Sequence, residues 1–225
     1  NITSIESAYF KISSASIGIP KVSQVKSVSV GAGVTSCPFS FDNPTVAGNL
    51  IFVMIFQVDD GNIAYDVSDG VNTYTLISYQ SASTSEGKTY YAKNIVGGTV
   101  SFTMTMPSST YAMQIMAMEI SNLDPVSPMD VNDYEEHYIT GNPIPVPTIT
   151  TTQDGDLIVA CAFQDIAANY TANGKIETQH SEGAHASGII QTYIAPTAGS
   201  YTPTFTADAF NDCAVTVVAF RRAVP

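Results

Sequence analysis

One apolar strand pattern occurs twice in this chain and limits its fold more than any other feature. Residues 48–57 read GNLIFVMIFQ and residues 155–164 read GDLIVACAFQ, so each run opens on glycine and ends in Phe-Gln. The seven apolar residues from Leu50 to Phe56 would form a strand of roughly 23 Å without a hydrophilic face. We expect such a strand in the middle of a sheet or sandwich, because it is too short to cross a bilayer as a helix of about 20 residues.

The repeat continues downstream of this strand. Four residues have an identical residue 102 positions later: Tyr91, Gly97, Ala112 and Ala117 correspond to Tyr193, Gly199, Ala214 and Ala219. We therefore predict one β-sandwich domain at 25–222, built from duplicated half-units at 25–122 and 145–222 with a crossover at 123–144. Each half-unit would contain a hairpin, turning near Gly97-Gly98 or Ala198-Gly199. The alternative is a chance similarity between short β patterns.

Composition agrees with an all-β fold. Only 12% of the 225 residues are charged and 44% are hydrophobic. Serine, threonine, glycine, proline and asparagine fill most of the remainder, which is typical of many short strands joined by turns. A chain of this length can bury a sizeable core. We predict an antiparallel, jelly-roll-like β-sandwich, preceded by an extra N-terminal strand segment.

The charge balance excludes some partners. Lysine and arginine total 8 against 20 aspartate and glutamate residues, a net charge of −12. Nucleic acid and anionic membrane surfaces are poor partners for such a chain, because both bind cationic side chains. We also expect no membrane insertion. The excess carboxylates either keep the surface soluble or bind divalent cations.

An acidic loop follows the first buried strand. Ca²⁺ accepts hard oxygen ligands on a flexible backbone, so this loop is a candidate calcium site, although its spacing is not that of an EF-hand. The alternative is that these aspartates form turns by bonding their own backbone. The candidate metal ligands are Asp59, Asp60, Asp66 and Asp69.

A second acidic cluster lies in the proline-rich connection between the half-units. Its five prolines predict extended or turn segments without regular strand pairing. Carboxylates and tyrosine rings together could bind a sugar, and a solvated crossover is the alternative. The candidate ligand-binding residues are Asp130, Asp133, Tyr134, Glu135 and Tyr138.

Catalytic signatures are missing from the sequence. His180 and His185 are five residues apart, so on one strand they would point to opposite faces and could not share a metal. The three cysteines, Cys37, Cys161 and Cys213, allow at most one disulfide, and Cys161 is expected to be a buried thiol. No nucleophile elbow, zinc motif or dinucleotide fingerprint occurs. The sequence therefore predicts a non-enzymatic protein.

Residues 1–24 stand outside the repeated pattern. Apolar residues alternate with polar ones here, which predicts two short, half-buried strands. This segment either folds back on its own sandwich or completes a sheet of a neighbouring copy by strand addition. The candidate assembly residues are Phe10, Ile12, Ile17 and Ile19.

The core strands also carry a resemblance to a known type of module. GNLIFVMIF, DGVNTYTL, YYAKNIVGG and YAMQIMAMEIS, followed by GDLIVACAF and AVTVVAFRR, resemble a β-sandwich module that recurs in bacterial extracellular proteins and phage structural proteins. The resemblance covers about residues 25–222 and implies an adhesive or structural surface module at an extracellular, cell-surface or virion location. It transfers no catalytic residue, and the chain departs from the pattern by lacking tryptophan and by its acidic crossover.

These observations predict a non-enzymatic structural or adhesive subunit of an extracellular filament or a virion surface assembly. Its partners would be further copies of the same chain or other surface subunits. The alternative function is a Ca²⁺-assisted carbohydrate-binding module with a glycan as its partner.

Overall fold

The computed structural model describes residues 18–31, 36–58, 66–82, 85–98, 101–105, 112–137, 141–182 and 186–224. All regular secondary structure in these ranges is β-strand. The described part of the chain therefore has no helix that is long and apolar enough to cross a membrane.

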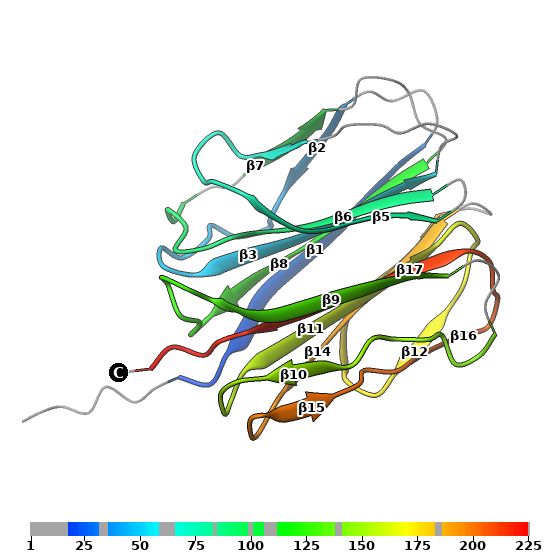
Figure 1. The fold of residues 1–225 in the computed structure, drawn as a ribbon. Coiled ribbons are helices and arrows are strands. Elements are labelled where there is room, and N and C mark those ends of the chain that lie inside the picture. The colour runs from blue at the N-terminus through cyan, green and yellow to red at the C-terminus, as the bar shows by residue number, and fades with distance from the viewer. Residues whose placement is uncertain are drawn as a thin grey trace, which may run out of the picture.

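Two five-stranded antiparallel sheets, here called the first and second central sheets, pack face to face in the middle of the molecule (Figure 1). The first has the order β1-β8-β3-β6-β5 and the second has the order β13-β14-β11-β17-β9. The first comprises β1 (Lys21–Gly31), β3 (Leu50–Val58), β5 (Thr75–Ala82), β6 (Ser85–Ala92) and β8 (Ala112–Ser121). The second comprises β9 (Met129–His137), β11 (Leu157–Gln164), β13 (Lys175–Glu182), β14 (Ala186–Ile194) and β17 (Cys213–Phe220).

Smaller sheets cover the outer faces of both central sheets, which gives the four layers seen in Figure 1. The first central sheet is covered by β2 (Ser36–Ser40), β7 (Ser101–Thr105) and β4 (Asp66–Ser68). The second is covered by two pairs, β10 (Ile149–Thr151) with β15 (Gly199–Tyr201) and β12 (Tyr170–Ala172) with β16 (Phe205–Ala207). The predicted all-β, antiparallel sandwich is confirmed.

The layering explains why β3 and β11 have no hydrophilic face. Alternate side chains of a strand point to opposite faces, and here both faces are covered. Along β3, Leu50, Phe52, Met54 and Phe56 enter the core between the central sheets, while Ile51, Val53 and Ile55 enter the core under β2 and β7. Strand β11 divides in the same way, and both strands lie at the centre of their sheets.

Each half of the chain builds its own pair of layers. Strands β1 to β8 form the first central sheet and its cover, and strands β9 to β17 form the second central sheet and its covers. In the first half, β1-β8-β3-β6 in one layer and β2-β7-β4 in the other follow the jelly-roll order. The two central sheets share one strand order, β1 corresponding to β9 and β5 to β13. A common origin of the two halves stays a prediction.

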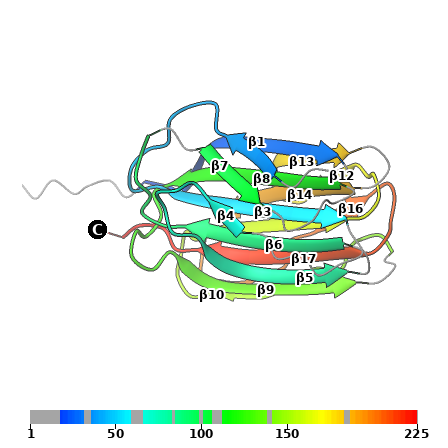
Figure 2. The same ribbon diagram turned by 90° about the horizontal axis from the view of Figure 1, so that it is seen from above.

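All four edge strands of the central sheets carry a β-bulge. The extra residues are Ser23 in β1, Ile77 in β5, Asp130 in β9 and Glu177 in β13. In Figure 2 the edges β5 and β9 lie together on one side of the molecule and β1 and β13 on the other, as the contacts between these strands also indicate. A bulge increases the local twist of a strand and changes the direction of one side chain. Each edge strand is therefore irregular, and one of its side chains points away from its regular direction.

The structure differs from the sequence expectation at the two predicted hairpins. Strand β6 lies in the first central sheet whereas β7 lies in its cover, so the chain changes layer between them instead of reversing within one sheet. The same holds for β14 and β15. The antiparallel neighbours in sequence are β5 with β6 and β13 with β14. Alternating strands on either side of the glycines do not reveal which layer each strand joins.

The proline-rich connection also differs from expectation. Nine of its residues form β9, which pairs with β17 from Met129 opposite Phe220 to His137 opposite Cys213. Pro128 and Pro143 lie outside the strand, so neither interrupts its hydrogen bonding. The second set of strands therefore begins well before residue 145.

The central sheets interlock through two phenylalanine and glycine pairs. Phe56 lies opposite Gly87 within the first sheet and Phe163 lies opposite Gly188 within the second. The two rings stack across the sheet interface with centroids 5.2 Å apart and planes at 14°. Each ring also covers the glycine of the other sheet, so a Cβ on Gly87 would lie 2.1 Å from Phe163 and one on Gly188 2.9 Å from Phe56. These glycines are required for close approach of the sheets.

Candidate functional site

The first acidic loop is only partly described. Asp59 and Asp60 lie outside the described residues, and Asp66 begins β4 without a described side chain. Asp69 lies in the turn that follows β4. The structure therefore leaves the predicted calcium site untested as a set of four ligands.

Asp69 organises its own turn. Its Oδ1 accepts hydrogen bonds from the N–H groups of Val71 at 2.9 Å and Asn72 at 2.7 Å. Its Oδ2 accepts from the Asn72 side chain at 2.6 Å and the Tyr74 hydroxyl at 2.9 Å. Burial by itself would raise the pKa of Asp69, but these hydrogen bonds together lower it. This arrangement is the turn-forming role that aspartate side chains adopt in loops.

The second cluster does not form one surface. Tyr138 lies outside the described residues, and the other four candidates lie on β9. Asp133 and Tyr134 are exposed, and Glu135 has its Oε2 3.0 Å from Nε2 of His137. Asp130 is the bulge residue, and its carboxylate is completely buried. The bulge thus separates Asp130 from the exposed side chains of the same strand.

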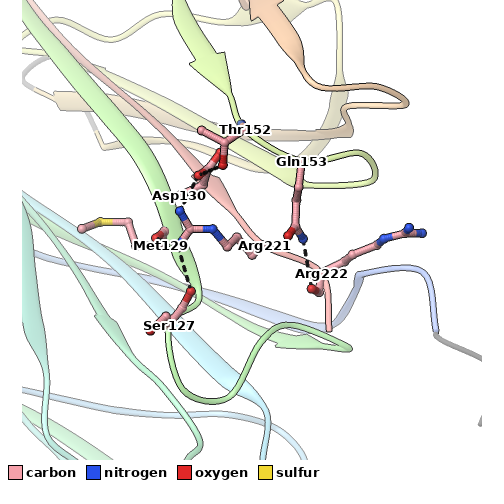
Figure 3. A network of polar contacts seen from close by, with 7 residues as sticks. All are labelled: Ser127, Met129, Asp130, Thr152, Gln153, Arg221 and Arg222. Carbon is pink, nitrogen blue, oxygen red and sulfur yellow. Dashed lines mark hydrogen bonds and ion pairs between the residues drawn. The ribbon is translucent and has the colours of Figure 1, made fainter. Parts of the chain in front are cut away.

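Asp130 is the centre of a polar network that joins three segments (Figure 3). It accepts hydrogen bonds from the backbone N–H of Thr152 at 2.6 Å and from the Thr152 hydroxyl at 2.5 Å. Arg221, just after β17, donates from Nη2 to Asp130 at 2.6 Å and from Nη1 to the carbonyl of Met129 at 2.8 Å. Burial would raise the pKa of Asp130, yet the Thr152 and Arg221 contacts hold it below its usual value.

A second buried carboxyl group, Asp156, lies against Asp130. Asp156 has no exposed surface, and no donor among the described residues reaches either of its carboxyl oxygens in good hydrogen-bond geometry. Burial raises its pKa to about 7, and the neighbouring Asp130 carboxyl contributes in the same direction. Two adjacent buried carboxyl groups disfavour ionisation of both at once.

The sequence missed Asp156 and Arg221. Asp156 is the polar residue that opens the second buried strand, at the place where the first repeat has Asn49. The change from an amide in the first repeat to an acid in the second was the signal in the sequence that could have drawn attention to Asp156. Arg221 is the first of two arginines that follow an apolar closing strand, and a cation next to buried residues indicates a carboxylate partner.

Buried hydroxyl and amide groups join the two central sheets between β5 and β17. Ser78 Oγ lies 2.7 Å from Thr89 Oγ1 and 2.8 Å from Thr216 Oγ1. Thr216 donates to Gln80 Oε1 at 2.8 Å, and Gln80 Nε2 donates to the carbonyl of Val215 at 2.7 Å. Every group in this seam has a partner, so the seam fixes the position of one sheet on the other.

Two shallow grooves lie where the chain enters the fold. One, of about 320 Å³, is lined by Val22, Leu157, Glu177 and Tyr193 among others, and the other, of about 330 Å³, by Asp154, Gly155 and Arg222 among others. Both include Pro20 and Ile194 in their walls. The grooves therefore adjoin each other on the two sides of the segment that leads into β1.

The remaining predicted residues bear on assembly and cysteine chemistry. Phe10, Ile12 and Ile17 lie outside the described residues, while the side chain of Ile19 is 70% exposed. The three cysteines are buried free thiols, as expected for Cys161. In the described ranges, no group of three or more histidine, cysteine or acidic side chains is arranged to hold a metal ion.

Comparisons with protein-family models, curated proteins and solved structures found no match to this chain.

Proposed function

We propose that this protein is a non-enzymatic structural or adhesive subunit of an extracellular filament or virion surface assembly, of the β-sandwich module type that its core strands resemble. Its partners would be copies of the same chain or other surface subunits. The observation that carries the proposal is the point of entry of the chain: residues 1–17 lead into β1, which is an edge strand of the first central sheet.

An edge strand can accept another extended segment. β1 pairs with β8 on one side, and no further strand pairs with it among the described residues. The bulge at Ser23 and the charge of Lys21 oppose unspecific pairing along its first residues. Addition of the N-terminal segment of a neighbouring copy would therefore use the regular part of β1, residues 25–31.

The acidic residues support a structural role. Asp69 and Asp130 each accept hydrogen bonds that hold a turn in place. Glu119, buried in β8, accepts from the Gln24 side chain at 2.7 Å, the Val46 N–H at 2.7 Å and the Asn49 side chain at 2.6 Å. These carboxylates stabilise the fold in the way that capping side chains do.

The alternative, a Ca²⁺-assisted carbohydrate-binding module, has less support. Asp69 already accepts four hydrogen bonds, and Asp130 is turned into the interior. Among the described candidates, Asp133 and Tyr134 are exposed enough for a sugar to reach, with 47% of the Tyr134 surface exposed. Calcium titration by calorimetry together with a glycan array tests this alternative.

Sedimentation of the intact chain and of two variants tests the proposal. In the first variant Phe10→Asp and Ile12→Asp remove the apolar side chains of the N-terminal segment, and in the control Ser13→Asp and Ser14→Asp add the same charge at polar positions. We expect the intact chain and the control to assemble with rising concentration, and the first variant to stay a folded monomer. If the intact chain is monomeric at high concentration, assembly through this segment is excluded.

A further inference from the structure

Asp130 and Asp156 form a buried pair in which only one carboxyl group has donors. The Asp130 side chain has no exposed surface and accepts from Thr152 and Arg221. Asp156 is equally buried, but its two oxygens meet no donor of suitable geometry in the described part of the chain. An ionised Asp156 would be a buried charge beside a second negative charge, which is strongly unfavourable.

We propose that Asp156 keeps its proton in mildly acidic solution, donates a hydrogen bond to Asp130, and thereby latches the turn at 152–156 and the C-terminal segment at 221–224 onto β9. Loss of this proton opens the latch. The pair is thus a pH-sensitive device at the end of the molecule where the chain enters and leaves the fold, and it is independent of the proposed function.

The charged groups around the pair are few. Arg221 is bound to Asp130, and Arg222 lies against the turn. Asp154 lies on the exposed side of the turn, where its Oδ1 accepts from the N–H of Ala198 at 2.7 Å. Strand β10 and residues 195–198 have no ionisable side chain. The weaker contacts of Asp156 with the Gln153 side chain and the Arg222 N–H favour its charged form but do not outweigh burial.

The contacts of the pair hold both the C-terminal segment at 221–224 and one wall of the groove that Gly155 and Arg222 line. Gly155, with φ of +82°, allows the Arg222 side chain to lie against it, since a Cβ there would be 2.7 Å from Arg222 Cδ. The N–H of Arg221 donates to the carbonyl of Pro128 at 2.6 Å, and the N–H of Ala223 donates to that of Asn122 at 2.9 Å. Opening at Asp156 would therefore release these amides and change the groove that Gly155 and Arg222 line.

Carboxyl-carbon NMR titration of the intact chain tests the proposal directly. We expect the Asp156 resonance to titrate with a midpoint near pH 7. Between about pH 4 and this midpoint, hydrogen exchange of the Arg221 and Ala223 amides should accelerate by about tenfold per pH unit beyond the intrinsic rate and then level off, because opening is coupled to loss of one proton. An Asp156 carboxyl group that is already ionised at pH 5 would overturn the proposal.

Two matched variants locate the effect. In Asp156→Asn the amide still donates to Asp130 but cannot ionise, so the additional exchange that develops between about pH 4 and pH 7 should vanish. In Asp154→Asn the same charge is removed from an exposed position of the same turn, and the pH dependence should remain. If Asp156→Asn keeps the pH dependence of the wild type, Asp156 is not the group that operates the latch; if it fails to fold, the titration of the wild-type carboxyl still decides.

Discussion

Replacement of Gly87 by alanine tests how the two central sheets interlock. A Cβ at this position would lie 2.1 Å from Cε1 of Phe163, whereas 3.4 Å is the start of ordinary contact. Phe163 would therefore have to move by more than an ångström, although it is 3% exposed and stacked on Phe56. Overpacking costs about 1–3 kcal/mol, and loss of the stacked geometry adds about 0.5–1.5 kcal/mol. We expect Gly87→Ala to destabilise the fold by about 2–4 kcal/mol.

The equivalent change in the other half should be milder. In Gly188→Ala the new methyl group meets Phe56 Cε1 at 2.9 Å and the terminal methyl groups of Met54 and Met116 at 3.1 and 3.2 Å. Methionine side chains adapt readily, so we expect a loss of about 1 kcal/mol. Gly199→Ala is the control, because nothing lies within 4 Å of the new Cβ, and it should be neutral or slightly stabilising.

Urea unfolding of the three variants measures these differences. The midpoints should rank Gly199→Ala highest, then Gly188→Ala, then Gly87→Ala, with unchanged slopes. A Gly87→Ala variant that unfolds at the same urea concentration as the wild type would show that the ring of Phe163 does not pack against Gly87.

Three further predictions follow from the buried polar groups. Burial raises the pKa of Asp156 from 3.8 to about 7, so the folded state holds this proton more tightly than the unfolded state. The free energy of unfolding should therefore fall by up to about 4 kcal/mol from pH 4 to pH 7. In urea titrations across that range, Asp156→Asn should abolish this fall. Glu119→Ala should cost about 2–4 kcal/mol in thermal unfolding, because it leaves Gln24, the Val46 N–H and Asn49 without their acceptor. Thr216→Val should cost about 1–3 kcal/mol, and a double-mutant cycle with Ser78→Ala should give a coupling above 0.5 kcal/mol; additive losses would show that the seam does not act as a unit.

The repeated apolar runs predicted the centre of the fold because their physics is local. The strand from Leu50 to Phe56 has apolar side chains on both faces, so both faces must be covered by other parts of the protein. Its central position therefore follows from its own residues. The layer that each neighbouring strand joins depends on distant partners. β7 alternates like a strand of any half-covered sheet, and the position of its Phe102 and Met104 in the outer core shows that it belongs to the cover.

The candidate site was harder to predict because bulges break the two-residue period. We predicted Asp130 and Tyr134 in one acidic cluster of the connecting segment, and on a regular strand their spacing would also place them on one face. The bulge at Asp130 redirects its side chain into the interior, where Thr152 and Arg221 bind it. A bulge can be recognised only when the residues of both paired strands are compared, so the sequence of β9 alone does not reveal it.

The two halves fix the turn before their central strand by the same physical means but with different residues. In the first half Glu119 of β8 binds the N–H of Val46 and the side chain of Asn49. In the second half Asp130 of β9 binds the N–H and hydroxyl of Thr152. Each turn presents a backbone donor that a carboxylate accepts, and the carboxylate comes from the strand next to the central strand in the first half and from the edge strand of the sheet in the second half. The two carboxylates therefore occupy positions that do not correspond between the halves. For this reason the sequence repeat predicted the central strands but not the acidic side chains that bind the turns before them.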